Sequence, residues 1–297
     1  MFGNMAYNPG AAGSYDMVNI AAIRRNQWMG FPGGPIFSYY NSNLPFNLFK
    51  RSHGAGITLT QDEVGFEKRT NINLAYAYRH NVGDGKLSIG LGFGLFMNSI
   101  NAEWKFPSSL ASPSTSSTTP NLLSEGLEDP AVPMGKEETV NAFNLDVGLM
   151  YKTDQLYFGV SSVHLNEAIL KYQGVEPRLR RHYFSTAGYS LPVPNSNFVL
   201  QPSCMVATDG SMSQLIINTT VVYNEKVWFG LSHRWSSAFT AMFGMELFKD
   251  VQVGFGYDIE TTKIMSYSSG SLEVMIRYSF EIVREKFPEV YRSVRYL

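Results

Sequence analysis

Five histidines are the side chains of this sequence best suited to acid–base or metal chemistry: His53, His80, His164, His182 and His233. A serine hydrolase with a nucleophile elbow carries G-x-S-x-G, and a zinc protease carries H-E-x-x-H on a helix. Neither motif occurs, and the histidines have no metal-ligand spacing. We therefore expect scattered polar side chains, with no catalytic residue, no cofactor and no metal site.

A second candidate for chemistry is the glycine-rich run 90–94 (GLGFG), because glycine-rich loops can cradle phosphate. Such a loop joins a strand to a helix, whereas this run lies inside a stretch of alternating residues. The pattern favours a strand that bends or approaches a neighbouring segment at its glycines. The single cysteine, Cys204, allows no intrachain disulfide and no thiolate metal cluster.

The segments that carry these side chains alternate between apolar and polar residues, which is the period of a β-strand. In one run Leu91 and Phe93 fall on one face, and Gly90 and Gly92 on the other. Runs of about ten residues suit tilted strands that cross a bilayer. We expect fourteen strands, at 17–27, 35–43, 52–62, 66–80, 85–100, 138–152, 155–163, 180–191, 197–207, 213–223, 226–235, 238–249, 250–260 and 270–282.

The composition favours a membrane barrel over a soluble β-sandwich, which would also alternate. Charged residues make up 16 % of the chain, against roughly 25 % in soluble domains. No run approaches about 18 apolar residues, so the sequence contains no transmembrane helix. A barrel hides its apolar residues by alternation, which agrees with a mean hydropathy of −0.12. A net charge of −1 gives no indication of nucleic-acid binding.

The expected connections sort by length into two sets, as in outer-membrane barrels. Short turns are expected at 83–84, 153–154, 194–195, 224–225 and 249–250, and long loops at 101–137, 164–179 and 261–269. With the N-terminus in the periplasm, the short turns are periplasmic and the long loops extracellular. The Ser/Thr/Pro-rich span 108–120 is expected to be a mobile loop. Since the first residues do not resemble a secretory signal, we expect the sequence to be the processed chain.

We expect a single all-β domain over 1–297, a transmembrane antiparallel barrel. It divides into an N-terminal periplasmic or plug segment (1–16), the barrel (17–282) and a periplasmic tail (283–297). A closed barrel should have no free sheet edge, so a partner should be recognised by loops and not by strand addition. Leu91 and Ile276 should face lipid, and a substitution at Gly148, on the lumen face, should be milder if it fits.

The lumen face carries charges of both signs, which we expect to pair inside a plugged or salt-bridged interior. A channel or a binding pocket is the alternative. These lumen charges are Arg79, Asp146, Arg234, Glu246, Asp258, Glu273 and Arg277.

Several motifs resemble those of the PorP/SprF family, the outer-membrane barrel proteins of the type IX secretion system. The run 5–14 (MAYNPGAAGS) is similar to the family's NPAYAGS-type opening, with Gly10-Ala11-Ala12 where an aromatic residue is usual. The run 24–35 (RRNQWMGFPGGP) resembles its R-x-Q-W-x-G-x-x-G-x-P hairpin. The run 62–65 (DEVG) resembles its D-x-x-G turn. The similarity continues through 75–79 and 85–91 and returns at 278–280 and 295–296.

This resemblance implies an integral outer-membrane protein that is not an enzyme. It implies partnership with a secreted surface protein, such as a gliding adhesin, which the barrel would anchor or help to export through the partner's C-terminal signal domain. Some family members instead dock the periplasmic ring of the secretion machine. A fatty-acid-transporter-like channel is a further alternative. Lipopolysaccharide, lipid and lipoprotein subunits are other expected contacts, and nucleic acid is not.

We predict partner contacts on both sides of the membrane. On the outer side, Trp28 and Phe31 suit the aromatic girdle, and Pro32 lies in the same hairpin. The complete set of predicted partner-binding residues is Trp28, Phe31, Pro32, Arg178, Arg180 and Arg181 outside, and Arg292 and Arg295 in the periplasmic tail. The loop 164–179 should hold the partner, whereas 108–120 should be dispensable.

Overall fold

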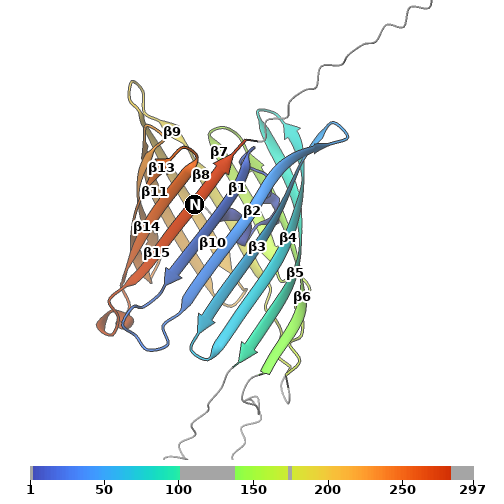
Figure 1. The fold of residues 1–297 in the computed structure, drawn as a ribbon, viewed down its shortest axis with the longest axis vertical. Coiled ribbons are helices and arrows are strands. Elements are labelled where there is room, and N and C mark those ends of the chain that lie inside the picture. The colour runs from blue at the N-terminus through green and yellow to red at the C-terminus, as the bar shows by residue number, and fades with distance from the viewer. Residues whose placement is uncertain (1–2, 101–137, 173–175, 282–297) are drawn as a thin grey trace, which may run out of the picture.

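The chain folds into a closed antiparallel β-barrel, seen from the side in Figure 1. The structure is a computed structural model that describes residues 3–100, 138–172 and 176–281. All fourteen predicted strands are confirmed. The strands are β1 (Val18–Asn26), β2 (Ile36–Leu48), β3 (Arg51–Val64), β4 (Glu67–Val82), β5 (Gly85–Ile100), β6 (Glu138–Lys152), β7 (Leu156–Val163), β8 (His182–Tyr189), β9 (Leu191–Pro192), β10 (Phe198–Thr208), β11 (Ser213–Tyr223), β12 (Val227–Arg234), β13 (Ala238–Phe248), β14 (Val251–Glu260) and β15 (Ser271–Phe280).

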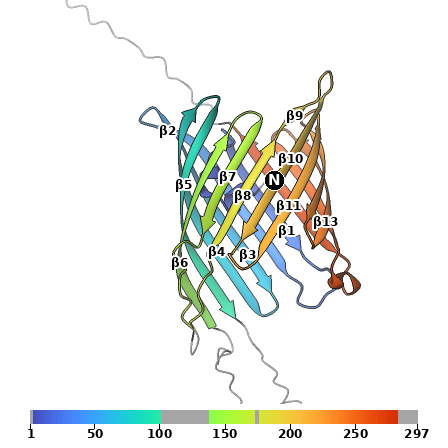
Figure 2. The same ribbon diagram turned by 180° about the vertical axis from the view of Figure 1, so that it is seen from behind.

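The barrel closes where its first and last strands pair. Over all nine residues of β1, from Val18 opposite Phe280 to Asn26 opposite Leu272, the register is unbroken. Elsewhere each strand pairs with its neighbour in sequence, and β8 and the short β9 both pair with β10 as one interrupted strand. The barrel therefore has 14 strands, as predicted. Figure 2 shows the far wall, with β7, β8 and β10 side by side.

The two faces of the wall differ as the alternation predicts. On β5, Leu91 and Phe93 are 45 % and 48 % exposed and point outward, whereas Ser88 and Asn98 are buried on the lumen side. This arrangement gives the barrel an apolar outer surface and a polar interior, which is the pattern that lipid selects. The described ranges contain no helix that is long and apolar enough to span a membrane.

The connections divide between two ends. At the short-turn end, uppermost in Figure 1, every connection between consecutive strands of the barrel has two to five residues: 49–50, 83–84, 153–155, 193–197, 224–226 and 249–250. At the opposite loop end the long connections 27–35, 101–137, 164–181 and 261–270 occur, together with short ones at 65–66, 209–212 and 235–237. The assignment of the short-turn end to the periplasm stays a prediction. The span 108–120 lies outside the described residues.

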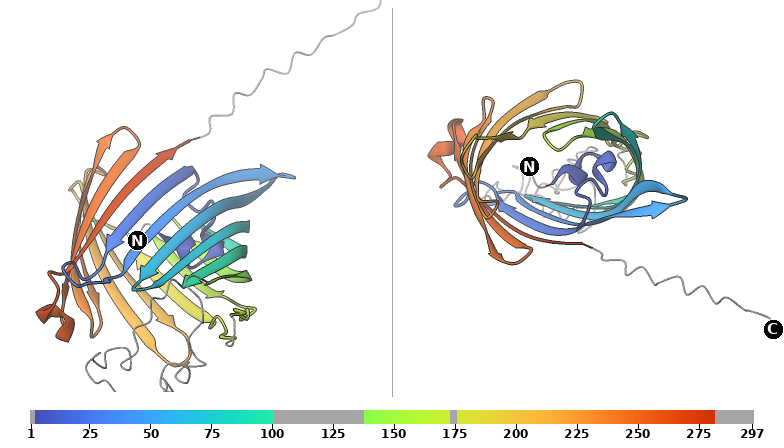
Figure 3. Two further views of the ribbon diagram at one scale, coloured as in Figure 1. Left: turned by 60° about the horizontal axis from the view of Figure 1, so that its bottom comes forward. Right: turned by 90° about the horizontal axis from the view of Figure 1, so that it is seen from above.

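The residues before β1 lie inside the barrel, as the view down its axis in Figure 3 shows. We call residues 3–17 the plug. It contains two short 3-10 helices, η1 (Asn4–Ala6) and η2 (Pro9–Ala11), and η2 contacts β4, β5, β6 and β7. The proposed division into segments 1–16, 17–282 and 283–297 stays a prediction, and residues 283–297 lie outside the described residues.

Candidate functional site

The plug fits the wall because glycines leave room for its backbone. A Cβ built on Gly90 would lie 2.2 Å from the nitrogen of Gly10, and one on Gly54 would lie 2.0 Å from the carbonyl oxygen of Ala12. Both distances are far below van der Waals contact, so any side chain at these positions would displace the plug. The prediction that the glycine-rich run marks a close approach is therefore confirmed at Gly90.

Gly148 belongs to the same contact surface, so the condition for a milder effect there, that the side chain fits, is not met. A Cβ at Gly148 would lie 2.1 Å from Oδ1 of Asn8. A substitution on this lumen face was expected to be milder if it fits, but period-two alternation does not reveal that a plug fills the space. Gly148 is thus a position where even a methyl group does not fit.

Hydrogen bonds complete the seating of the plug. The buried Asn8 side chain donates to the carbonyl of Leu149 on β6 (3.0 Å) and accepts from its own turn at Gly10 N (2.8 Å). The Ser161 hydroxyl on β7 donates to the carbonyl of Tyr7 (2.6 Å). Because Asn8 caps η2 and also bonds to the wall, one side chain both shapes the plug and fixes it to the barrel.

Charged side chains hold the last plug residues near the short-turn end. Asp16 pairs with Arg79 of β4 (2.8 Å) and Lys86 of β5 (3.0 Å). Burial alone would raise the pKa of Asp16, but the hydrogen bonds and charges of Lys86 and Arg79 outweigh it, and the net shift is downward. The ring of Tyr15 lies between two cations, Lys152 and Arg277, each 4.9 Å from its centroid.

Opposite the plug, the lumen wall carries an ion-pair cluster. Arg25 pairs with Asp258 and, at 3.6 Å, with Glu273, while Arg234 lies 3.5 Å from Asp258. The expected pairing of lumen charges of both signs is present here. Arg25, which was not among the predicted lumen charges, lies at the centre of the cluster.

At the loop end the lumen contains a cavity of about 640 Å³, which we call the vestibule. The aromatic rings of Phe37, Phe96 and Phe184 line it, and Ala6 of the plug forms part of its wall. Charged side chains of both signs also line it: Asp62, Glu67, Arg69, Arg178 and Arg180. A pocket with apolar rings and a few charges suits a ligand that is part apolar and part polar.

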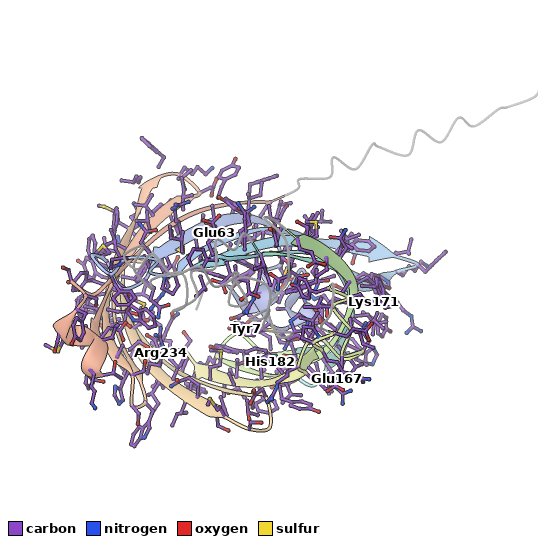
Figure 4. The ribbon with its side chains drawn as sticks, turned by 90° about the horizontal axis from the view of Figure 1, so that it is seen from below. Tyr7, Glu63, Glu167, Lys171, His182 and Arg234 are labelled. Atoms are coloured by element: carbon purple, nitrogen blue, oxygen red, sulfur yellow. The ribbon has the colours of Figure 1, made fainter. Side chains whose placement is uncertain are left out.

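Two histidine rings lie next to each other in the wall of the vestibule. The rings of His164 and His182 lie 6.0 Å apart, and His164 hydrogen-bonds through Nδ1 to the Asn144 side chain (2.7 Å). Burial, with the nearby His182, lowers the pKa of His164 to about 4, so this ring is neutral at neutral pH. Figure 4, a view into the loop end, shows His182 and Tyr7 on the lumen side.

Three buried polar atoms in the vestibule have no hydrogen-bond partner among the described residues. They are Oδ1 of Asn71, Oδ1 of Asn98 and the hydroxyl of Tyr172. Burial, together with Glu67, raises the pKa of Tyr172 to about 12, so its hydroxyl keeps a proton that it can donate. Since buried polar groups are normally satisfied, these atoms indicate where a bound molecule or water would make hydrogen bonds.

The structure brings only some of the predicted site residues to the vestibule. Arg178 and Arg180 line it, and Arg180 also contacts Asp209 (3.6 Å). Arg181 turns instead toward the carbonyl of Leu165, to which it donates at 2.8 Å. Arg292 and Arg295 lie outside the described residues.

Trp28, Phe31 and Pro32 lie apart from this cavity, in the connection between β1 and β2. Trp28 and Phe31 meet edge to face, with ring centroids 6.3 Å apart. The connection bonds to that between β14 and β15, for example from Met29 N to Gly270 O (2.8 Å). These two connections lie together at the lower left in Figure 1. The predicted residues thus form two separate groups at the loop end.

Sequence reasoning missed the vestibule residues His164, His182 and Tyr172. The histidines were treated as scattered because they come from two ends of one long connection and meet only when it folds back. Among the described residues, no group of three or more His, Cys, Asp or Glu side chains could hold a metal ion.

Comparisons with known proteins agree with this architecture. A family model described as "Type IX secretion system membrane protein PorP/SprF" matches residues 1–278. No curated protein matches. Among solved structures the chain is similar to the CymD monoaromatic hydrocarbon channel, with a TM-score of 0.52 and 11 % identity over 95 % of this chain and 94 % of that one.

Two further solved structures are similar. The toluene transporter TbuX of Ralstonia pickettii gives a TM-score of 0.51 and 12 % identity, over 95 % of this chain and 94 % of that one. The outer membrane protein Omp33 of Acinetobacter baumannii gives a TM-score of 0.50 and 6 % identity, over 89 % of this chain and 98 % of that one. At these identities the likeness shows the fold alone.

The barrel, its outer-membrane neighbours and the family match establish the broad identity of the molecule. It is an integral outer-membrane protein and a component of the type IX secretion system. The match extends over most of the chain, which confirms the resemblance seen in its N-terminal motifs. The chain belongs to the PorP/SprF family of type IX secretion system membrane proteins.

Proposed function

We propose that this barrel binds a secreted surface protein at the outer membrane and anchors it or helps to export it. The partner's C-terminal domain would contact the vestibule and the connection 164–181. The observation that carries this proposal is the vestibule itself, which opens at the loop end and holds unpartnered polar atoms beside aromatic rings. A polypeptide supplies both the amide donors that Asn71 and Asn98 lack and side chains that pack on Phe96 and Phe184.

The seating of the plug favours a binding role over transport. A channel needs a continuous lumen, and the plug, held by Gly90, Gly148 and Asn8 through backbone contacts and hydrogen bonds, occupies the side of the lumen lined by β4 to β7. Releasing it would break these contacts with every passage. Conductance in a planar bilayer tests the alternative, since a transporter-like channel would conduct and a plugged anchor would conduct little.

The experiment on the proposed function compares two tyrosine variants in cells. Tyr172→Phe removes the unpartnered vestibule hydroxyl but keeps the ring, which belongs to a buried cluster with Leu170 and Val140. Tyr189→Phe removes a hydroxyl at the short-turn end and serves as the control. Protease-accessible partner protein at the cell surface, measured relative to the amount of barrel, should fall for Tyr172→Phe and stay unchanged for Tyr189→Phe.

A stronger variant replaces the connection 164–179 with a short turn, and it should abolish retention of the partner, whereas deletion of 108–120 should leave retention intact. If both variants retain the partner and truncation at Val283 stops secretion generally, the periplasmic ring-docking role would replace the anchoring role.

A further inference from the structure

Between β6 and β7 the barrel wall has a region where one strand extends well beyond its neighbour. β6 has 15 residues and β7 has 8, and the two pair only from Val147 opposite Ser162 to Lys152 opposite Tyr157. The outer half of β6, residues 138–146, therefore has β5 on one side and no strand on the other. The expectation that a closed barrel has no free sheet edge is wrong here, because closure of the sheet does not require strands of equal length.

Nearest to β7, this edge is capped by the residues that follow β7. Leu165 N donates to the carbonyl of Leu145 (2.8 Å), and Oδ1 of Asn166 accepts from Leu145 N (3.1 Å). Nδ2 of Asn166 donates to the carbonyl of Phe143 (2.7 Å). One asparagine side chain thus takes the place of a strand's backbone for two residues of β6.

The capping stops after the carbonyl of Phe143. In an antiparallel strand both backbone groups of a residue point to the same side, and every second residue points to that side. Since the backbone N–H and C=O of Leu145 point away from β5, those of Phe143 and Asn141 do so too. Within the part of the chain that the structure describes, no hydrogen bond is shown to Phe143 N–H or to the outward N–H and C=O of Asn141.

This open edge begins at Phe143, at the border of the apolar belt, and continues beyond it. The outward side chains of β6 change from Leu149 and Phe143, both exposed apolar residues, to Asn141 and Thr139. Unpaired backbone is not tolerated in contact with hydrocarbon, so capping within the belt and an open edge from its border outward is the arrangement that a bilayer permits. With the loop end at the cell surface, as predicted, the open groups are accessible to a molecule there.

A groove of about 500 Å³ runs along the edge. One side is β6 from Thr139 to Phe143, and the other is formed by Asn166, Ala168, Ile169 and Lys171. Lys171 is exposed and takes part in none of the ion pairs found among the described residues. Figure 4 shows it at the rim of the wall, outside the lumen.

We propose that this edge receives an extended segment of the secreted partner, which pairs with β6 as an added strand. Its backbone would bond to Asn141 and to Phe143 N–H, and an acidic side chain on it would pair with Lys171. Backbone groups that alternate along an edge match an extended polypeptide, which is the basis of strand addition. The inference rests on the proposed function for the source of the strand.

The test titrates a fluorescein-labelled peptide of alternating Thr and Val with one central Asp against the full chain in lipid nanodiscs. Asn141→Pro removes the outward N–H and leaves the bonds of β6 to β5, because proline is tolerated where the N–H faces away from the sheet. It should weaken binding by up to about tenfold, as expected for the loss of one backbone hydrogen bond. Asn141→Thr keeps the N–H and should bind like the unmodified protein.

Two further arms separate the possible occupants of the edge. A peptide N-methylated at alternate residues cannot pair through its backbone and should not bind, and Lys171→Glu should weaken binding of the unmethylated peptide. Equal binding of both peptides, or no effect of Asn141→Pro, would overturn the proposal. Tighter peptide binding after deletion of 108–120 would also overturn it in favour of the chain's own segment, and cross-linking between two barrels at position 141 would do so in favour of a second copy.

The corresponding cell experiment distinguishes this inference from the proposed function. If Asn141→Pro leaves surface retention of the secreted partner intact while replacement of 164–179 abolishes it, strand addition is wrong and the anchoring role stands. If neither change affects retention, the anchoring role itself fails. Loss of retention with Asn141→Pro but not with Asn141→Thr supports both strand addition at β6 and the anchoring role.

Discussion

At Gly148 the absence of a side chain keeps the plug in place. Gly148→Ala would bring a methyl group to 2.1 Å from Asn8 Oδ1, so we expect overpacking to destabilise the plugged state by about 1–3 kcal/mol. Gly256→Ala is the matched control, because a Cβ on that lumen-facing glycine has its nearest neighbour at 3.5 Å. Limited proteolysis of residues 3–17 measures the effect: the plug should be cleaved faster in Gly148→Ala only. Equal cleavage in the two variants would contradict the close contact.

His164 should respond to acid in a defined range. Its ordinary pKa of 6.5 falls to about 4 in the folded barrel through burial and the proximity of His182. Between these values the unfolded chain binds a proton that the folded chain does not, so stability from neutral His164 is complete above pH 6.5 and is lost as the pH falls toward 4. An NMR titration of the imidazole should have its midpoint near 4, and His164→Gln should remove that signal. A midpoint near 6.5 would show that the ring is not buried.

At the scale of the strand, the two faces should differ in their tolerance of charge. Leu91→Arg puts a cation on the outward face of β5, where it costs roughly 2–4 kcal/mol at the bilayer midplane. Thr240→Arg puts the same side chain on the lumen side of β13, opposite Asp258. Folding yield into lipid vesicles should fall for Leu91→Arg and change little for Thr240→Arg. Similar yields would mean that the assignment of faces is wrong.

The barrel wall should fold and close without the plug. β1 and β15 pair along the whole of β1, and this closure does not involve residues 3–13. Deletion of residues 3–13 should therefore leave a folded barrel but raise its conductance in a planar bilayer, because Gly54, Gly90 and Gly148 would line open space. Gly256→Ala again serves as a control for a lumen change that does not touch the plug. Unchanged conductance would show that other groups close the lumen.

Strand positions could be read from the sequence because lipid on one side and a polar lumen on the other impose a strict period of two. The same period could not show that Gly90 and Gly148 face the plug. Alternation shows on which face of the wall a residue lies, but not what that face contacts. The free edge of β6 could have been predicted from the sequence, because the predicted strands 138–152 and 155–163 already differ in length. The meeting of His164 and His182 depends on the path of a long connection, on which alternation gives no information.

As a whole, the molecule should behave as a single closed barrel in detergent. Its ladders run continuously around the wall, including the pair of β1 with β15. Unboiled protein should therefore migrate faster on a denaturing gel than boiled protein, and it should fractionate with the outer membrane. A chain that lacks β15 cannot close and is the control that should show no such shift. Identical migration before and after boiling would contradict a closed barrel.

The pairing of the first strand with the last has a consequence for how the molecule is made. Val18 and Phe280 lie at opposite ends of the sequence, so the last seam of the wall forms between segments of maximal separation along the chain. Such contacts carry a high entropic cost and slow folding. The seam cannot form before the final strand has been delivered to the membrane, and until then β1 and β15 both expose unpaired edges. The interval between delivery of the chain and formation of this seam is thus the period in which the polypeptide depends most on other factors for protection from aggregation.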